Sequence, residues 1–206
     1  MEEKKMSEAQ SLTLITSMIN ETRARMTKNL GKPFLIWGYL TVAVALVQAT
    51  AAIIVRDFYI YLWGWFIIPV VGWPLMLLFN KQEKGATNYI DRCLNAVWCG
   101  IGVTALILPL ILKFGSGLFP VIIILMGIGT VTTAAVVKNK TIRGIGYAAI
   151  LSSLLFPLAE YILFPLEEFC SGERYSAECI IFAVLIFLLL VVSGHVLNYK
   201  EKCLKN

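Results

Sequence analysis

Long runs without charged residues dominate the chain, and short clusters of charges separate them. Five runs hold 20 to 24 residues each, and a sixth is interrupted only by Glu160. The hydrocarbon core of a bilayer is about 30 Å thick and needs roughly 20 apolar residues of helix to cross it. The pattern therefore predicts six transmembrane helices, over residues 33–55, 58–80, 93–112, 114–137, 144–166 and 179–199.

These runs are expected to be helical because lipid offers no partner for backbone N–H and C=O groups, which a helix satisfies internally. A transmembrane β-barrel would show alternating segments of about ten residues, which this sequence lacks. The predicted fold class is all-α: a polytopic membrane helical bundle over residues 33–200, with a tail at 201–206.

A different pattern precedes the first span. Apolar residues recur there at helical spacing, and Arg23, Arg25 and Lys28 make its second half basic. We therefore expect an interfacial amphipathic helix over residues 1–32, lying along the inner leaflet. Two roles are open for it. It is either a membrane-surface anchor or a docking element for a cytosolic protein partner through residues 7–30.

Composition supports the same class. Of the 206 residues, 58% are hydrophobic and 15% are charged, whereas a soluble domain has about 45–50% apolar and about 25% charged residues. So few polar groups could not cover a soluble core of this size, and the composition also excludes a disordered chain and a disulfide-rich secreted miniprotein. The lipid bilayer is therefore the first expected partner.

The basic residues sort by side of the membrane. With both termini cytoplasmic, 15 of the 18 Lys and Arg residues fall on the cytoplasmic side, and only Arg56, Lys113 and Arg174 fall on the other. Because cytoplasmic loops carry an excess of Lys and Arg, this bias predicts that both termini face the cytoplasm. The net charge of +5 then reflects topology, and we expect no nucleic-acid partner.

Aromatic and small residues indicate how the spans are placed and packed. Aromatic residues near the predicted span ends are typical of headgroup anchors, among them Trp37, Tyr39, Trp63, Trp65 and Trp98. Small residues four apart let helices approach closely, and they predict packing rows at Thr41, Ala45 and Ala49 and at Gly144, Ala148 and Ser152.

Residues able to support catalysis are scarce. His195 is the single histidine, which excludes an HExxH zinc site. Asp57 and Asp91 are the only aspartates and would lie on opposite sides of the membrane, which excludes an intramembrane aspartyl pair. Neither a GxSxG nucleophile motif nor a GxxxxGK[ST] phosphate loop is present. We therefore expect a protein that is not an enzyme and has no cofactor and no metal site.

Glu160 is the one acidic residue within a predicted span. A carboxylate in the membrane is costly unless it is protonated, hydrated or paired. Lys113, Arg56 and Arg174 are the basic residues predicted on the same side. Three interpretations are open: an interfacial ion pair beyond the kink at Pro157, a span that ends earlier than predicted, or a carboxylate that couples transport to protons or cations.

Three further polar residues in the spans are candidate functional residues: His195, Gln48 and Asn95. His195 lies near the cytoplasmic end of the last span, where packing or an interface contact is favoured over a proton relay. Gln48 and Asn95 are expected first to form hydrogen bonds between helices and second to contact a substrate.

Two cysteines flank an acidic outer loop, Cys170 and Cys179. On the oxidising side of a bacterial inner membrane they would be the candidate disulfide pair. The spacing of the other cysteines indicates no metal site.

The segment Ser11–Leu12–Thr13–Leu14–Ile15, with Met18–Ile19 and then Phe34–Leu35–Ile36–Trp37–Gly38–Tyr39, resembles a group of uncharacterised six-span bacterial inner-membrane proteins of similar length. The resemblance implies the cell inner membrane and brings no assigned activity. In outline the chain is also similar to permease subunits of some ABC exporters, although its cytoplasmic loops are very short for holding an ATPase. We expect a non-catalytic sensor, scaffold or regulatory partner. The alternative is a small transporter or permease subunit that uses kinked spans and Glu160.

Overall fold

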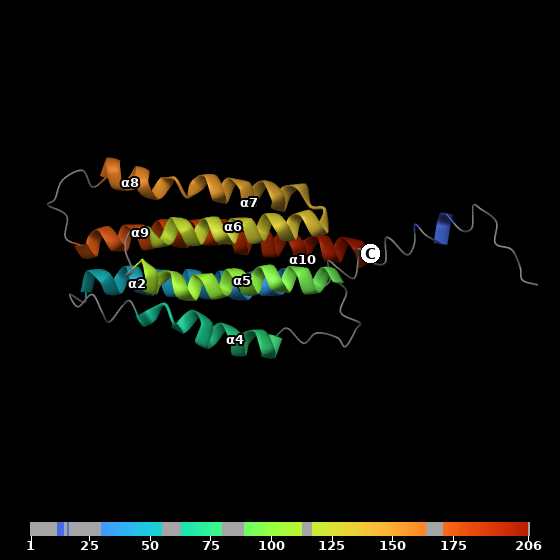
Figure 1. The fold of residues 1–206 in the computed structure, drawn as a ribbon, viewed down its shortest axis with the longest axis horizontal. Coiled ribbons are helices and arrows are strands. Elements are labelled where there is room, and N and C mark those ends of the chain that lie inside the picture. Colours follow the sequence, from blue (N-terminus) through green and yellow to red (C-terminus); the bar gives the residue numbers. More distant parts are fainter. Residues whose placement is uncertain are drawn as a thin grey trace, which may run out of the picture.

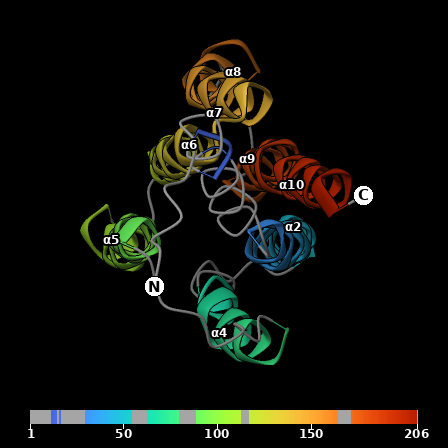
Figure 2. The ribbon, with the colours of Figure 1, turned by 90° about the vertical axis from the view of Figure 1, so that its right-hand side faces the viewer.

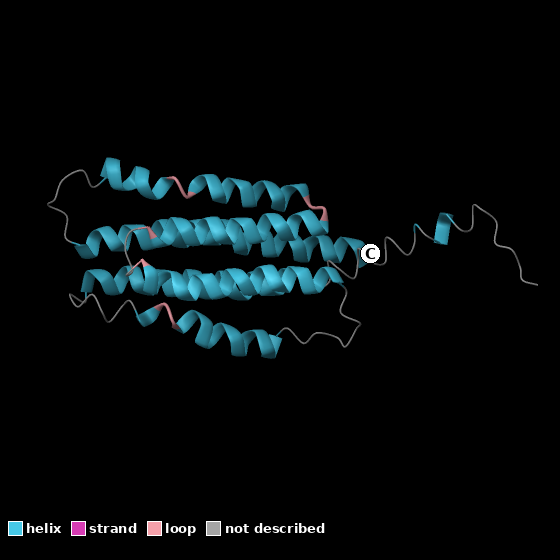
Figure 3. Ribbon diagram, in the orientation of Figure 1, coloured by secondary structure: helices cyan, strands magenta, loops and turns pink. Residues whose placement is uncertain are grey.

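The computed structural model describes residues 12–14, 16, 30–54, 63–79, 89–112, 117–163 and 171–205. Every regular element in these ranges is helical, which confirms the all-α fold (Figure 3). In chain order they are α2 (Gly31–Ile54), α4 (Ile67–Phe79), α5 (Tyr89–Ile111), α6 (Leu118–Val137), α7 (Lys140–Ser152), α8 (Leu155–Leu163), α9 (Ser171–Ile186), the π-helical turn η1 (Phe187–Val191) and α10 (Val192–Lys205).

The helices lie side by side and run alternately in opposite directions (Figure 1). Helices α7 and α8 form one lengthwise run, and α9, η1 and α10 form another. The start of α2 and the end of α10 lie at the same end of the bundle. Viewed end-on, α4 lies beside α2 and α5 beside α6, at the edge of the molecule (Figure 2).

Among the described residues, five segments are long and apolar enough to cross a membrane: Gly31–Ile54, Arg92–Ile111, Leu118–Val137, Lys140–Ile162 and Gly172–Cys203. In the remaining predicted span, 58–80, the helix that the structure describes as a complete element is α4, with 13 residues. At 1.5 Å per residue α4 is about 20 Å long, short of a hydrocarbon core. Pro69 lies in its first turn, where proline is tolerated, and Trp63–Phe66 form a turn before it. The sixth crossing therefore stays a prediction.

The core forms where α2 packs antiparallel along α9, η1 and α10. Thr41, Ala45 and Ala49 are all buried in this contact, so the packing row predicted for the first span is confirmed. Near the start of α2 the two backbones nearly touch. A Cβ atom on Gly31 would lie 2.6 Å from the Gly194 carbonyl oxygen, so glycine is required at this crossing.

Helices α6 and α7 form a tight hairpin. Lys138 adopts a left-handed conformation with φ of 54°, and Asn139 caps α7 by accepting hydrogen bonds from the backbone N–H groups of Thr141 and Ile142. Within the hairpin, Gly127 and Gly146 face each other, and a Cβ on either would lie 3.1 to 3.2 Å from the other's carbonyl oxygen.

The packing row predicted at Gly144, Ala148 and Ser152 is wrong. Gly144 and Ala148 are exposed, and a Cβ on Gly144 would meet nothing within 4 Å. The packed face of α7 instead carries Gly146 and Ala149. Small residues occur on both faces of this helix, so their four-residue spacing alone did not identify the packed one.

Candidate functional site

Glu160 lies on α8, at the end of the bundle away from the start of α2. The run of α7 and α8 is broken by a turn at Ser153–Leu154, where Pro157 lacks the N–H group that would bond to Ser153. Glu160 Oε1 accepts a hydrogen bond from the Arg174 guanidinium of α9. Of the three cations predicted on this side, Arg174 is the one in contact; Lys113 and Arg56 lie outside the described residues.

Arg174 joins two carboxylates. Its Nε lies 3.5 Å from Glu178 Oε1, one turn further along α9, while its terminal amino group contacts Glu160. The Glu160 side chain is 46% exposed, so it lies on the outside of the bundle and not in its interior. An exposed ion pair of this kind stabilises a fold by about 0–1 kcal/mol. The geometry therefore favours an interfacial ion pair between α8 and α9.

His195 lies at the opposite end, where α10 meets α2. Its Nε2 is 3.0 Å from the Tyr39 hydroxyl, with the two rings edge to face. Both side chains are exposed, so the pair occupies the outer seam between the two helices. Ser193, two residues earlier, faces the core with no exposed surface. A nucleophilic Ser193–His195 pair is therefore absent from this geometry.

Gln48 and Asn95 are far apart in the structure. Gln48 is buried on α2, and its amide occupies the space that a Cβ on Gly64 would fill. Glycine at position 64 thus leaves room for the amide beside the turn that precedes α4. Asn95 is exposed on the outer face of α5. Glu160, His195, Gln48 and Asn95 consequently do not converge on one site.

Aromatic rings close the interior near the Glu160 end. Phe119 packs against Trp65, Phe156, Tyr175 and Phe182, with ring centroids 5.0 to 6.0 Å apart. The Trp65 indole N–H donates to the Tyr175 hydroxyl across 2.7 Å. This cluster joins the segment before α4 to helices α6, α8 and α9.

Apolar side chains fill the rest of the interior. The following are buried with at most 1% of their surface exposed: Ile123, Ile142, Ile186, Leu189 and Leu197. The buried hydroxyls of Thr130 and Thr133 donate to carbonyl oxygens of their own helix, Met126 and Gly129. These two hydroxyls are thus bonded to the backbone of their own helix.

Two tryptophans predicted as headgroup anchors are structural instead. Trp65 belongs to the aromatic cluster, and Trp98 donates to Thr133 Oγ1 across 3.1 Å while packing edge to face on Phe34. Trp98 thereby attaches α5 to α6 and α2. Trp63 is 71% exposed and fits an anchor. Sequence position near a span end did not distinguish these roles, because packing partners come from distant helices.

One polar atom was not singled out by sequence. Ser193 Oγ is buried and has no hydrogen-bond partner among the described residues. Other helical hydroxyls donate three or four residues back, as Ser153 does to Ile150. The corresponding residues for Ser193 are Leu189 and Leu190, both in η1, where the hydrogen bonding shifts to i→i+5.

The predicted disulfide involves one described thiol, that of Cys179. Cys179 is a free, fully buried thiol in α9, and Cys170 lies outside the described residues, so the disulfide stays a prediction for the oxidised chain. In the part of the chain that the structure describes, no three His, Cys, Asp or Glu side chains gather as metal ligands would.

The fold and these contacts define an all-helical bundle with five helices long and apolar enough to cross a membrane. Comparisons of the chain with family models, with curated proteins and with solved structures found no match. What the protein does must therefore be inferred from its own contacts and charges.

Proposed function

We propose that the chain is a six-span protein of the bacterial inner membrane that acts, without catalysis, as a sensor, scaffold or regulatory partner. The outer surface of the bundle supports a lipid environment. Ile54 and Leu77 are 79% and 76% exposed, and large apolar side chains cover the outer faces of α2, α4, α5 and α8. Apolar surface this extensive is typical of a membrane interaction surface.

The distribution of charge supports cytoplasmic termini. Basic side chains gather at the end where α2 begins and α10 ends: Lys32, Lys138, Lys140, Arg143, Lys200 and Lys202. The opposite end carries Glu160, Glu173 and Glu178 with Arg174. An excess of Lys and Arg marks the cytoplasmic side.

The path of the chain supports the sixth crossing. Helix α2 ends at the acidic end of the bundle, and α5 begins at the basic end (Figure 1). Between them in the chain, α4 runs lengthwise along the bundle, which supports a sixth crossing at this point.

The single observation that carries the non-transport function is the separation of the polar residues around a closed apolar core. Glu160 and Asn95 face outward near opposite ends, and Gln48 is enclosed beside Gly64. A transport path would need polar groups lining one continuous route through the bundle.

The position of α2 supports a cytosolic docking role for the segment before it. Residues 7–30 lie almost entirely outside the described residues, but α2 starts at Gly31 against Gly194 of α10. The segment is therefore joined to the bundle at its basic end, beside α10. We infer that it binds a cytosolic protein there.

We expect Cys203 to react with a membrane-impermeant maleimide only after the membrane is permeabilised, because it is exposed in the last turn of α10, at the basic end of the bundle. The assay uses spheroplasts and a chain in which Cys203 is the only cysteine. The matched control, Glu173→Cys in a cysteine-free chain, places an exposed thiol at the acidic end and should react in intact spheroplasts. Labelling of Cys203 before permeabilisation would contradict the proposed topology.

The runner-up function is a small transporter, and the observation in its favour is Glu160 on a broken span. We expect proteoliposomes of the wild type to conduct no more protons under a pH gradient than empty liposomes, measured with an enclosed pH dye, and Glu160→Gln to give the same result. A wild-type proton flux that Glu160→Gln removes would establish the transporter instead.

Deletion of residues 2–30 is expected to leave membrane insertion intact and to abolish recovery of the cytosolic partner.

A further inference from the structure

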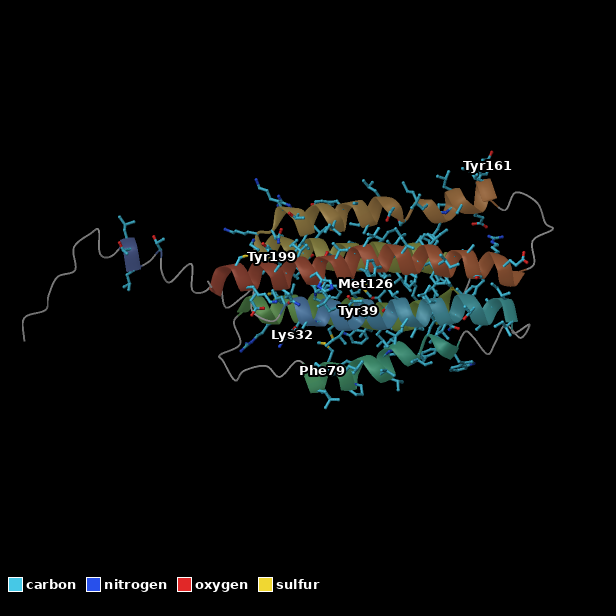
Figure 4. All side chains as sticks on the ribbon, turned by 180° about the vertical axis from the view of Figure 1, so that it is seen from behind. Lys32, Tyr39, Phe79, Met126, Tyr161 and Tyr199 are labelled. Carbon is cyan, nitrogen blue, oxygen red and sulfur yellow. The ribbon has the colours of Figure 1, made fainter. Side chains whose placement is uncertain are left out.

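Two stripes of hydrogen-bond donors meet on the outer seam between α2 and α10. On α2, Lys32 and Tyr39 are seven residues apart and so share one face. On α10, His195, Tyr199 and Lys202 follow at intervals of four and three residues and also share a face. All five side chains are exposed, and the Tyr39–His195 hydrogen bond of 3.0 Å joins the stripes. Figure 4 shows Lys32 and Tyr199 near this end of the bundle and Tyr39 further toward its middle.

The Tyr39–His195 contact and Lys32 lie near the level of Gly31, whereas Tyr199 and Lys202 lie further toward the basic end, because α10 runs opposite to α2 and rises about 1.5 Å per residue. The close approach of Gly31 to Gly194 places the first turn of α2 level with the first turns of α10. Side chains on a helix lean toward its N-terminus, so Tyr39 reaches back toward the basic end and meets His195. The nearby carboxylate, Glu201, is half-buried and lies six residues from His195, on another face of α10.

Below the donors, toward the middle of the bundle, the same seam is apolar. Leu46 continues the Lys32–Tyr39 stripe seven residues further along α2 and is exposed. On the α10 side of the seam, Phe187 and Leu188 of η1 are exposed; they precede His195 by eight and seven residues and so lie nearer the middle of the bundle. The seam thus changes from cationic and hydrogen-bonding to apolar over about two turns of helix.

We propose that this seam binds an anionic glycerophospholipid, with the phosphate held by Lys32, Tyr39 and His195, the outer part of the headgroup facing Tyr199 and Lys202, and an acyl chain lying on Leu46 and Leu188. Ammonium, phenol and imidazole groups are the donors that a phosphodiester accepts, and basic sites between helices on the cytoplasmic side bind anionic headgroups. The proposal rests on the proposed membrane topology, which places the basic end at headgroup level.

A second stripe provides a matched control. Lys140, Arg143 and Tyr147 of α7 lie at the same end of the bundle, and all three are exposed. They resemble the seam in composition, but they lie on one helix. If attraction between basic residues and an anionic surface were sufficient, both stripes would bind lipid equally well.

The test is native mass spectrometry of the full chain in a neutral detergent, titrated with dioleoylphosphatidylglycerol or dioleoylphosphatidylcholine. We expect phosphatidylglycerol to bind more tightly and the double variant Lys32→Gln/Lys202→Gln to weaken it by about tenfold or more, since each basic residue at the surface contributes about 1 kcal/mol. Tyr39→Phe removes only the hydroxyl and should weaken binding by a smaller factor. Arg143→Gln/Tyr147→Phe should leave it unchanged.

Equal losses in the seam and control variants, or equal binding of the two lipids, would overturn the proposal. Binding of inorganic phosphate that displaces phosphatidylglycerol from the seam would also overturn the proposal, because the site would then bind phosphate and not a lipid. The melting temperature of each variant is measured to check that it is folded. The maleimide assay separates the two levels of inference: correct labelling without lipid selectivity rejects the seam only, whereas labelling of Cys203 in intact spheroplasts rejects the topology.

Discussion

Replacing Gly146 by leucine is expected to disrupt the α6–α7 hairpin. Even the first atom of a side chain there would lie 2.6 Å from Val131 Cγ2, 3.1 Å from the Val131 backbone nitrogen and 3.2 Å from the Gly127 oxygen. The valine methyl can move aside, but the two backbone atoms move only if the helices separate. Overpacking of this kind costs about 1–3 kcal/mol, which corresponds to a fall in melting temperature on the order of 5 °C.

The matched control is Gly144→Leu, two residues earlier on the same helix. Gly144 is exposed and has open space around it, so leucine there should change the melting temperature little and add apolar surface toward lipid. Melting is measured by differential scanning fluorimetry of both variants in the same detergent. Equal melting temperatures for Gly146→Leu and the wild type would show that the hairpin is not packed as described.

Deletion of Leu188 is expected to be tolerated, although deletions within buried helices are usually destructive. Leu188 lies in η1, where a π-turn holds one residue more than an α-turn. Removing one residue lets the helix close as a regular α-helix, while the residues on both sides keep their faces. The Ser193 hydroxyl would then have a normally placed carbonyl four residues back, which removes the cost of a buried unsatisfied group, about 1–3 kcal/mol.

The control is deletion of Ile128, which is also exposed but lies in a regular α-helix. Removing one residue there rotates all later residues of α6 by about 100° and turns Thr130 and Thr133 out of the core. We expect a monodisperse peak on size exclusion for the Leu188 deletion and aggregation for the Ile128 deletion. Aggregation of both would mean that η1 is essential and not an extra residue.

The sequence was most informative about the positions of the long helices. Gly31–Ile54 and Leu118–Val137 lie within a few residues of the charge-free runs, because the same apolar residues determine both length and boundary. It was less informative where backbone chemistry intervenes. The break at Ser153–Leu154 comes four residues before Pro157, since a proline disturbs the turn that precedes it.

Pairings between distant residues were the hardest to predict. Charge and the predicted side of the membrane reduce the possible partners of Glu160 to three cations. Only the packing of α8 beside α9 selects Arg174 among them. The Tyr39–His195 contact joins residues 156 positions apart, and only the packing of α2 on α10 brings them together. The buried thiol of Cys179 belongs to the same category, since its position depends on which face of α9 meets the core.

The pairing of α2 with α9, η1 and α10 also determines the order in which the protein can be completed. Helix α2 leaves the ribosome first among the described helices, and its principal partners leave last. Until then the face of small residues on α2, with Gly31, is not covered by these partners. The core therefore closes only at the end of synthesis, and a chain that stops before α9 keeps that face exposed.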